Sequence, residues 1–240
     1  MTATDLASTL QVDPKTVERW ISNGRVPHQR HRVATAKALA VEPAYLWPEV
    51  ANQNNVPSAG GGELLAVYPT RSAVPASVWR RLIDEARANV DVLVYSGLFL
   101  LDTHPDLPHK LVERAASGLQ TRFLYGNPDA ENVAQRGRDE GIDEGLAARI
   151  RIALTYMSPA SATDGIEVRQ HETVLYNSLY RFDQELLVNT HTAGMPASQS
   201  PVLHLMQADG APLFDHYLRS FEWVWQRALP VDPAKAPMTP

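Results

Sequence analysis

DLASTLQVDPKTVERWISNGRVP, residues 5–27, has the pattern of two short helices joined by a tight connection. Asp13 and Pro14 mark the start of the second helix, because an Asp N-cap accepts hydrogen bonds from free backbone N–H groups and Pro is favoured at the first helical position. The small side chain of Ala7 allows the two helices to approach closely. The residues expected to face inward from the second helix are Val17, Trp20 and Ile21. This stretch predicts a helix-turn-helix.

The outward side of this second helix, and the segment that follows it, are rich in basic residues. From Asp13 to Lys37 six basic residues stand against two acidic ones, in a chain whose formal net charge is -5. In a helix-turn-helix the N-terminal part of the second helix enters the major groove, and nearby cations bind phosphates. The predicted base-facing residues are Lys15, Thr16, Arg19 and Ser22, and the predicted phosphate contacts are Arg25, His28, Arg30 and Arg32. Double-stranded DNA is the expected partner, and a helical hairpin that contacts another protein is the alternative.

Composition limits the class of protein. The chain has 240 residues, 44% of them hydrophobic, which is ordinary for a soluble globular protein. It has no cysteine, so disulfides and thiolate metal sites are excluded. Its longest apolar stretches are broken by polar residues and fall short of the roughly 20 residues of a membrane helix, and its first residues lack the pattern of a secretory signal. We therefore expect a cytoplasmic protein without a membrane partner.

The chain divides by composition into a helical part and a larger mixed part. Residues 1–48 contain the helix-turn-helix and a third helical pattern that includes Val33, Ala36 and Leu39. The segment EVANQNNVPSAGGG, residues 49–62, has the composition of a linker. The second domain spans residues 63–230, and residues 231–240 form a Pro-rich tail that we expect to be flexible.

Within the second domain, strand-like runs alternate with amphipathic ones. VDVLVYS (90–96), TRFLY (121–125) and RIALTYM (151–157) are predicted strands, with helical patterns at 107–116 and 129–146 between them. IEVRQ, VLYNSLYRF and ELLVNTH follow with short breaks and are expected to add to the sheet as antiparallel strands. A last helix is predicted over 212–228. The pattern indicates an α/β domain with a mixed sheet, behind a small all-α domain.

The motifs LAST, VDPKTVERWISNGRVP and TAKALAVEPAYLWP resemble the Cro/C1-type (XRE) helix-turn-helix family of transcription regulators. This resemblance covers the predicted helical domain and implies sequence-specific DNA binding. Members usually carry another helix before the one that starts here at Asp5, where only Met1 to Thr4 remain. Whether this domain is complete therefore stays open.

The segment VRQHETVLYNSLYRFDQELLVNTHTAG is similar to the phospholipase D-like superfamily, whose motif places a Lys two residues and an Asp seven residues after a nucleophilic His. Aligned on His171, these positions hold Thr173 and Ser178. The resemblance implies a single repeat that has lost catalysis and kept a pocket, so we expect no enzyme activity. A phosphodiesterase or nuclease with His171 as nucleophile is the alternative. From LVYSGLFLLD to HYLRSFEWVW the domain also resembles an uncharacterised domain attached to actinobacterial helix-turn-helix regulators.

Polar residues among apolar strand residues are the candidates for a ligand site. Spacing of two places Arg169 with His171, and Asn189 with His191, on one face of their strands, so that two polar pairs could converge on an anionic ligand. The full candidate set is Arg169, His171, Tyr176, Asn177, Asn189, His191 and Arg136, with Arg138 as a further candidate. The alternative is that these side chains satisfy buried backbone groups. We expect neither a metal nor a cofactor, since no His pair has the helical spacing of a metal site.

These expectations combine into one functional hypothesis. The chain is expected to be a homodimeric transcription regulator that binds DNA with its first domain and a small anionic or phosphorylated ligand with its second. Phospholipase D-like enzymes complete their site with two repeats or a dimer, which is why the resemblance implies a homodimer. A DNA-binding protein whose second domain only dimerises is a further alternative.

Overall fold

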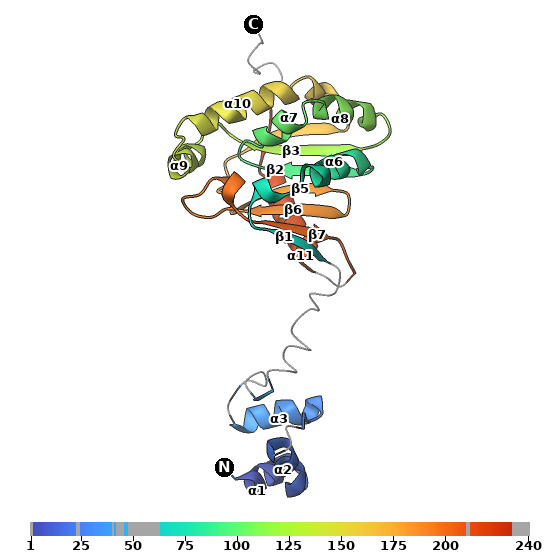
Figure 1. The fold of residues 1–240 in the computed structure, drawn as a ribbon, viewed down its shortest axis with the longest axis vertical. Coiled ribbons are helices and arrows are strands. Elements are labelled where there is room, and N and C mark those ends of the chain that lie inside the picture. The colour runs from blue at the N-terminus through green and yellow to red at the C-terminus, as the bar shows by residue number, and fades with distance from the viewer. Residues whose placement is uncertain are drawn as a thin grey trace. The chain divides into compact units, whose positions relative to one another are not determined.

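The computed structural model describes residues 2–22, 25–39, 41, 46–47, 63–209 and 212–231. The chain divides into two compact units, residues 1–60 and 61–240, which are treated separately below (Figure 1). The predicted linker 49–62 and residues 232–240 of the predicted tail lie outside the described residues.

The first unit contains the helices α1 (Ala3–Leu10), α2 (Pro14–Ser22) and α3 (Gln29–Leu39). Helix α1 begins two residues before Asp5, because Thr2 and Asp5 form a reciprocal capping box at its N-terminus. Between α1 and α2 lie three residues, of which Gln11 adopts a left-handed conformation with φ 54°. The two helices thus follow each other through one tight turn.

A small apolar cluster holds this unit together. Leu6 and Ala7 of α1 are buried with Val17 of α2, and Trp20 packs against the cluster. Ile21, predicted to face inward, is instead 70% exposed. Fewer side chains of α2 face inward than predicted. Val17 and Trp20, which lie one turn apart, make the contact with α1, and Ile21 lies outside this contact.

The second unit is built on one eight-stranded sheet in the order β1-β7-β6-β5-β2-β3-β4-β8. Its strands are β1 (Leu64–Tyr68), β2 (Asn89–Leu93), β3 (Gln120–Gly126), β4 (Ile166–His171), β5 (Asn177–Phe182), β6 (Glu185–Thr190), β7 (Val202–Met206) and β8 (Leu229–Pro230). Strands β2, β3 and β4 are parallel, and the other neighbours pair antiparallel. This confirms the prediction of an α/β domain with a mixed sheet.

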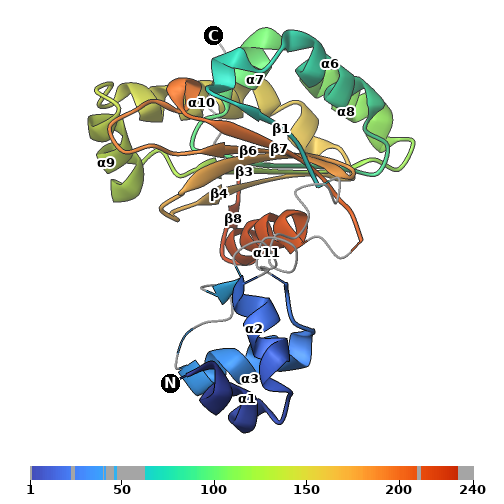
Figure 2. The same cartoon turned by 60° about the horizontal axis from the view of Figure 1, so that its bottom comes forward.

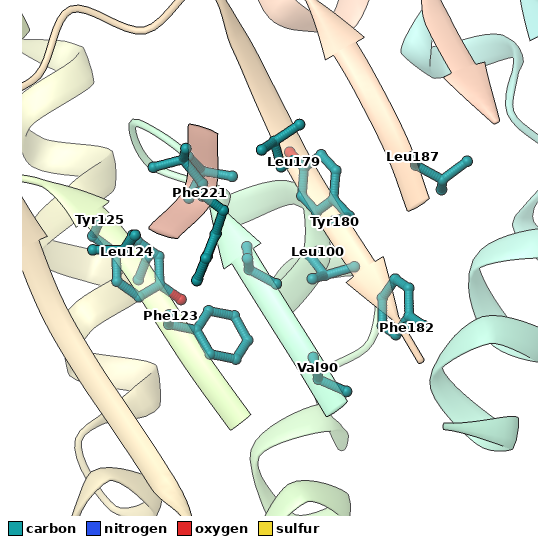
Figure 3. Packing of buried hydrophobic residues seen from close by; sticks show 14 of the residues in the cluster. Val90, Leu100, Phe123, Leu124, Tyr125, Leu179, Tyr180, Phe182, Leu187 and Phe221 are labelled. Carbon is teal, nitrogen blue, oxygen red and sulfur yellow. The ribbon is translucent and has the colours of Figure 1, made fainter. Parts of the chain in front are cut away.

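Helices cover both faces of this sheet (Figure 2). One face carries α6 (Ala76–Glu85), α7 (Leu98–Thr103), α8 (Leu107–Ala115) and α10 (Gly145–Met157), and α9 (Glu131–Asp139) lies beside α10. The helix α11 (Pro212–Trp225) covers the opposite face. Buried side chains of the helices on both faces pack with those of the central strands. Figure 3 shows Leu100 of α7, Tyr180 of β5 and Phe221 of α11 among them. No helix of the described parts of the chain is long and apolar enough to span a membrane.

Two predictions for this unit are wrong. Residues 151–157 form the end of helix α10 and not a strand, because Leu146, Ile150, Ala153 and Met157 are buried at helical spacing. The run IEVRQ pairs parallel to β3 as strand β4 and is not an antiparallel addition, since α9 and α10 provide a crossover connection between the two strands. The sequence pattern also predicted no element at β1, α6, α7 or β7.

Candidate functional site

The start of α2 presents a basic surface. The Asp13 carboxylate accepts the backbone N–H of Lys15 at 2.8 Å, which confirms the predicted N-cap. The side chains of Lys15 and Arg19 are exposed, and Thr16 is half-buried. Ser22 is exposed, and its hydroxyl donates to the carbonyl of Glu18 at 2.6 Å. The cap therefore fixes the helix start while the two cations stay on its surface.

The predicted phosphate contacts lie in the segment before α3 and in its first turn. Arg25, His28 and Arg30 are exposed, and Arg32 is half-buried. The backbone carbonyl of His28 accepts the N–H groups of His31 and Arg32, at 2.8 and 3.1 Å. Within the described residues of the first unit, none of the basic side chains forms an ion pair. Their positive charge is thus not neutralised by a neighbouring carboxylate there.

In the second unit, His171 is locked by backbone groups. It is 2% exposed, and its Nε2 lies 3.1 Å from the carbonyl oxygen of Val94. Because a carbonyl only accepts, Nε2 carries the proton, and Nδ1 accepts the N–H of Thr173 at 3.2 Å. Burial lowers the pKa of His171, so the neutral ring is favoured. Both ring nitrogens are therefore engaged.

Arg169 and Asn189 also have structural partners. The guanidinium of Arg169 lies 4.0 Å from the ring centre of Trp225 and donates to the Trp225 carbonyl and to Glu167. The Asn189 amide donates to the carbonyls of Ser200 and Pro201, both at 3.1 Å. For His171 and Asn189 the structure thus shows the alternative weighed from the sequence, in which polar side chains satisfy backbone groups.

Three further candidates also lie outside a shared cavity. Tyr176 is 81% exposed, and Asn177 is half-buried at the start of β5. Arg136 is buried, pairs with Glu140 at 2.7 Å and donates to the carbonyl of Met195 at 3.0 Å. Arg138, on the same helix, pairs with Glu131 at the surface. The structure therefore does not bring the predicted polar pairs together on one ligand.

His191 does line a cavity, beyond the carboxyl end of β2. Its Nδ1 lies 3.1 Å from the carbonyl of Leu175 and so carries the proton. Its Nε2 is left to accept the hydroxyl proton of Ser178 at 3.0 Å. Burial lowers the pKa of His191 to about 4, and the nearby positive charge of Arg136 acts in the same direction. The imidazole is therefore neutral at pH 7.

This cavity has a volume of about 70 Å³. It combines polar and charged groups from η1 (Arg71–Ala73), α10 and β5 and from the residues that follow α9, β2 and β6: Arg71, Tyr95, Glu140, Arg149, Ser178, Tyr180 and His191. The ring of Tyr95 stacks against that of His191, with the centroids 5.9 Å apart. Of the seven predicted ligand residues, His191 alone is among the described residues that line it.

Sequence reasoning missed most of these residues. Ser178 stood out only as a departure from the phospholipase D motif, and Arg71 lies in a segment that carried no predicted element. Tyr95 and Ser96 end the run VDVLVYS, and polar residues directly after a buried strand are a usable signal for a site at the edge of a sheet.

A larger cavity of about 520 Å³ lies at the opposite end of β2, beside the β5–β6 turn. Its charged groups are already paired: Arg81 binds Glu185 at 2.7 Å, and Glu185 also contacts His204 at 2.7 Å. Because a ligand would have to compete with these pairs, the smaller cavity is the better candidate site. Among the described residues, no three His, Asp or Glu side chains group as a metal site requires.

The second unit also carries the match to a known family. Residues 62–202, more than half of the chain, match the family described as Domain of unknown function (DUF5919). The chain belongs to this family. No curated protein matches the DUF5919 chain. Because the match begins at residue 62, it does not test the resemblance of residues 1–48 to Cro/C1-type regulators.

Solved structures give two remote likenesses to the DUF5919 chain. TrmBL2, described as an archaeal chromatin protein with a novel mode of DNA binding, is 12% identical with a TM-score of 0.43, over 92% of this chain and 72% of that one. Nuc from Salmonella typhimurium, described as a phospholipase D family member, is 15% identical with a TM-score of 0.40, over 65% and 89%. At these TM-scores neither likeness carries an argument about function.

Proposed function

We propose that the chain is a sequence-specific DNA-binding transcription regulator that uses α2 as its recognition helix. One observation carries this proposal: α1 and α2 follow each other through a three-residue turn, and the second helix exposes Lys15 and Arg19 without an ion-pair partner among the described residues. Helices joined in this way can lay the second one in a major groove, where Arg bonds guanine edges and Lys bonds guanine edges or phosphates.

The segment after α2 supports the same proposal. Arg25, His28 and Arg30 extend the exposed basic surface along the chain. Contacts of this kind to phosphates supply affinity that falls with salt, whereas contacts to base edges supply the choice of sequence. Binding of DNA by this unit should therefore depend strongly on salt.

In this proposal the DUF5919 unit senses a small ligand and forms the homodimer. The chain acts in the cytoplasm. A two-fold dimer would place two recognition helices on the half-sites of a palindromic operator. A ligand would change DNA affinity only by binding one dimer geometry better than another. Light scattering on the purified chain tests the dimer directly.

We also propose that the chain is not a phosphodiesterase of the phospholipase D type. A nucleophilic His needs an unprotonated nitrogen that can reach phosphorus. The Nδ1 of His171 is occupied by the N–H of Thr173, and its protonated Nε2 donates to Val94. The alternative enzyme would require at least the bond between Nδ1 and the Thr173 N–H to break, or a change of tautomer that frees Nε2. Hydrolysis of a phosphodiester that is lost in His171→Ala would overturn this part of the proposal.

The DNA-binding proposal predicts that Lys15→Ala and Arg19→Ala each weaken binding to a selected site by about 1 to 3 kcal/mol, roughly 5- to 150-fold, because each removes a contact to DNA. The helix itself should persist, since the backbone of Lys15 keeps its bond to Asp13. The site is selected from random DNA by the full chain, and affinities are measured by fluorescence anisotropy at fixed salt.

Arg80→Ala is the matched control, because Arg80 is an exposed cation on α6 in the other unit. It removes the same charge and should leave DNA affinity unchanged. If no sequence is enriched, or if Arg80→Ala weakens binding as much as Arg19→Ala does, the helices of the first unit are not a sequence-reading module.

A further inference from the structure

The hydroxyl of Tyr180 is an unusual group in the DUF5919 unit. Tyr180 is 1% exposed on the face of β5 that α6 and α7 cover, where its ring packs edge-on against Trp79 and Phe99. Its hydroxyl is buried and forms no hydrogen bond of normal geometry with any described residue, although Ser178 and Arg71, which line the same cavity, lie close enough to interact with it. Leaving a buried polar group unpaired costs about 1 to 3 kcal/mol. A ligand in the cavity would supply the missing partner.

The charges around this cavity favour an anion. Arg71 and Arg149 line it, and neither forms an ion pair with any described residue. Glu140 is the one carboxylate among the described lining residues, and it is neutralised by Arg136 at 2.7 Å. The guanidinium of Arg71 is held in place over the ring of Phe99, 3.9 Å from its centre. The cavity thus carries an excess of positive charge on oriented donors.

The His191–Ser178 pair adds an acceptor. Because Nδ1 of His191 donates to Leu175, its Nε2 accepts a hydrogen bond from the Ser178 hydroxyl. The Ser178 oxygen, which also lines the cavity, is then available to accept a hydrogen bond. The cavity therefore offers donors on Arg71, Arg149 and Tyr180, and one acceptor on Ser178. An oxyanion that itself carries a proton fits this set better than one that does not.

The size of the cavity limits what can enter. Its volume of about 70 Å³ exceeds the ~30 Å³ share of one water molecule and is far below the ~300 Å³ of a drug-sized pocket. We infer that this cavity binds hydrogen phosphate, either as the free ion or as the monoprotonated phosphate group of a small phosphomonoester. This inference deepens the proposed function, because it names the class of ligand that the second unit would sense.

Binding of radiolabelled inorganic phosphate to the full chain, measured by equilibrium dialysis at pH 7 without DNA, tests the inference. We expect saturable binding that Tyr180→Phe and Arg71→Gln each weaken by about 10-fold or more, because each removes a hydrogen bond to a charged ligand. Sulfate, which has the same shape and no proton at this pH, should compete at least several-fold less well. Arg80→Ala is again the matched control and should bind as wild type does.

The Tm of Tyr180→Phe distinguishes a loss of the binding site from a loss of folding stability. Tyr180→Phe removes an unpaired buried hydroxyl, so its Tm without phosphate should equal or exceed that of the wild type. A lower Tm would mean that the hydroxyl has a structural partner, and would overturn the argument from the unpaired group. Unchanged phosphate affinity in both pocket variants would also overturn the inference, because the ion would then bind elsewhere.

The source of the phosphate group is distinguished by competition with glycerol 3-phosphate. Displacement of labelled phosphate by the ester supports a phosphomonoester ligand, and its failure to compete supports the free ion. The test is independent of the DNA-binding proposal. Phosphate binding that depends on Tyr180 supports the pocket even if Arg19→Ala leaves DNA affinity unchanged, and specific DNA binding without phosphate binding refutes the pocket alone.

Discussion

Asp91→Asn is expected to lower the free energy of unfolding of the DUF5919 unit by about 3 kcal/mol, because removing one partner leaves buried charges uncompensated. Asp91 is 2% exposed in the middle of the sheet. Its carboxylate binds Arg122 of β3 at 2.6 Å and Arg181 of β5 at 2.9 Å. The neutral amide would leave both guanidinium groups, which are mostly buried, without this counter-charge.

The expected loss follows from the position of this network. The pairing register aligns Asp91 with Arg122 on one side and with Arg181 on the other, so one carboxylate joins three adjacent strands. Helix α11 closes over them: its Glu222 binds Arg122 at 2.8 Å, and its Phe221 ring lies 4.7 Å from the Arg122 guanidinium. Loss of Asp91 should therefore loosen the contact between the helix and the sheet as well as the strand pairing.

Urea unfolding followed by tryptophan fluorescence measures this effect, since Trp79 and Trp225 are buried in the second unit. The matched control is Asp129→Asn, whose partner Arg151 lies at the same 2.6 Å but at the surface. Exposed pairs contribute about 0 to 1 kcal/mol. Equal losses in the two variants would show that burial does not strengthen the Asp91 network, and the account of the sheet would be wrong.

The sequence predicted the class of the second unit but not its connections. Alternation of apolar runs identified β2, β3 and the β5–β6 hairpin, because buried strands leave a clear pattern. The same pattern failed for residues 151–157, where RIALTYM alternates like a strand although Ile150, Ala153 and Met157 follow a helical period from Leu146 onward. A window this short does not reveal the helical period. Without a helix at these residues, the crossover connection that makes β4 parallel to β3 was not predicted either.

The candidate site was less predictable because its groups come from distant parts of the chain. Arg71, Arg149 and His191 meet through the sheet order, which no local spacing reveals. Local reasoning selected His191, a polar residue at the end of a strand that lines the cavity. It also selected His171 and Asn189, whose partners are backbone carbonyls and N–H groups that a sequence does not show. The predicted DNA contacts on α2 remain predictions.

The stability of the DUF5919 unit should fall as the pH is lowered from about 6.5 towards 4, and His191 should cause much of the loss. Its pKa is about 4 in the folded chain, against an ordinary value of 6.5, because burial and the nearby Arg136 disfavour the charged ring. Between these values the unfolded chain binds a proton that the folded chain does not, so protonation favours unfolding. Above pH 6.5 neither state is protonated and this contribution is constant.

At 1.36 kcal/mol for each pKa unit, His191 alone should remove about 3 kcal/mol across the window, and about 2 kcal/mol by pH 5. Burial also lowers the pKa values of His171 and His204, which adds loss in the same direction. Urea unfolding at pH 7 and pH 5 measures the difference. His191→Gln should make the fall between these values smaller by about 2 kcal/mol, because the amide does not titrate.

His109→Gln is the control for this experiment, since His109 is exposed on α8 and its replacement should leave the pH dependence as it is in the wild type. An equally steep fall in His191→Gln would mean that the ring is protonated in the folded chain at pH 5. In that case Nε2 would donate to Ser178 at pH 5 instead of accepting its proton. Ser178 would then be free to donate into the cavity at that pH, and the preference for a protonated oxyanion would be lost there. At pH 7 the neutral ring would still accept from Ser178, because Nδ1 donates to Leu175. The pH dependence of folding therefore tests over which pH range the proposed hydrogen-bond direction holds.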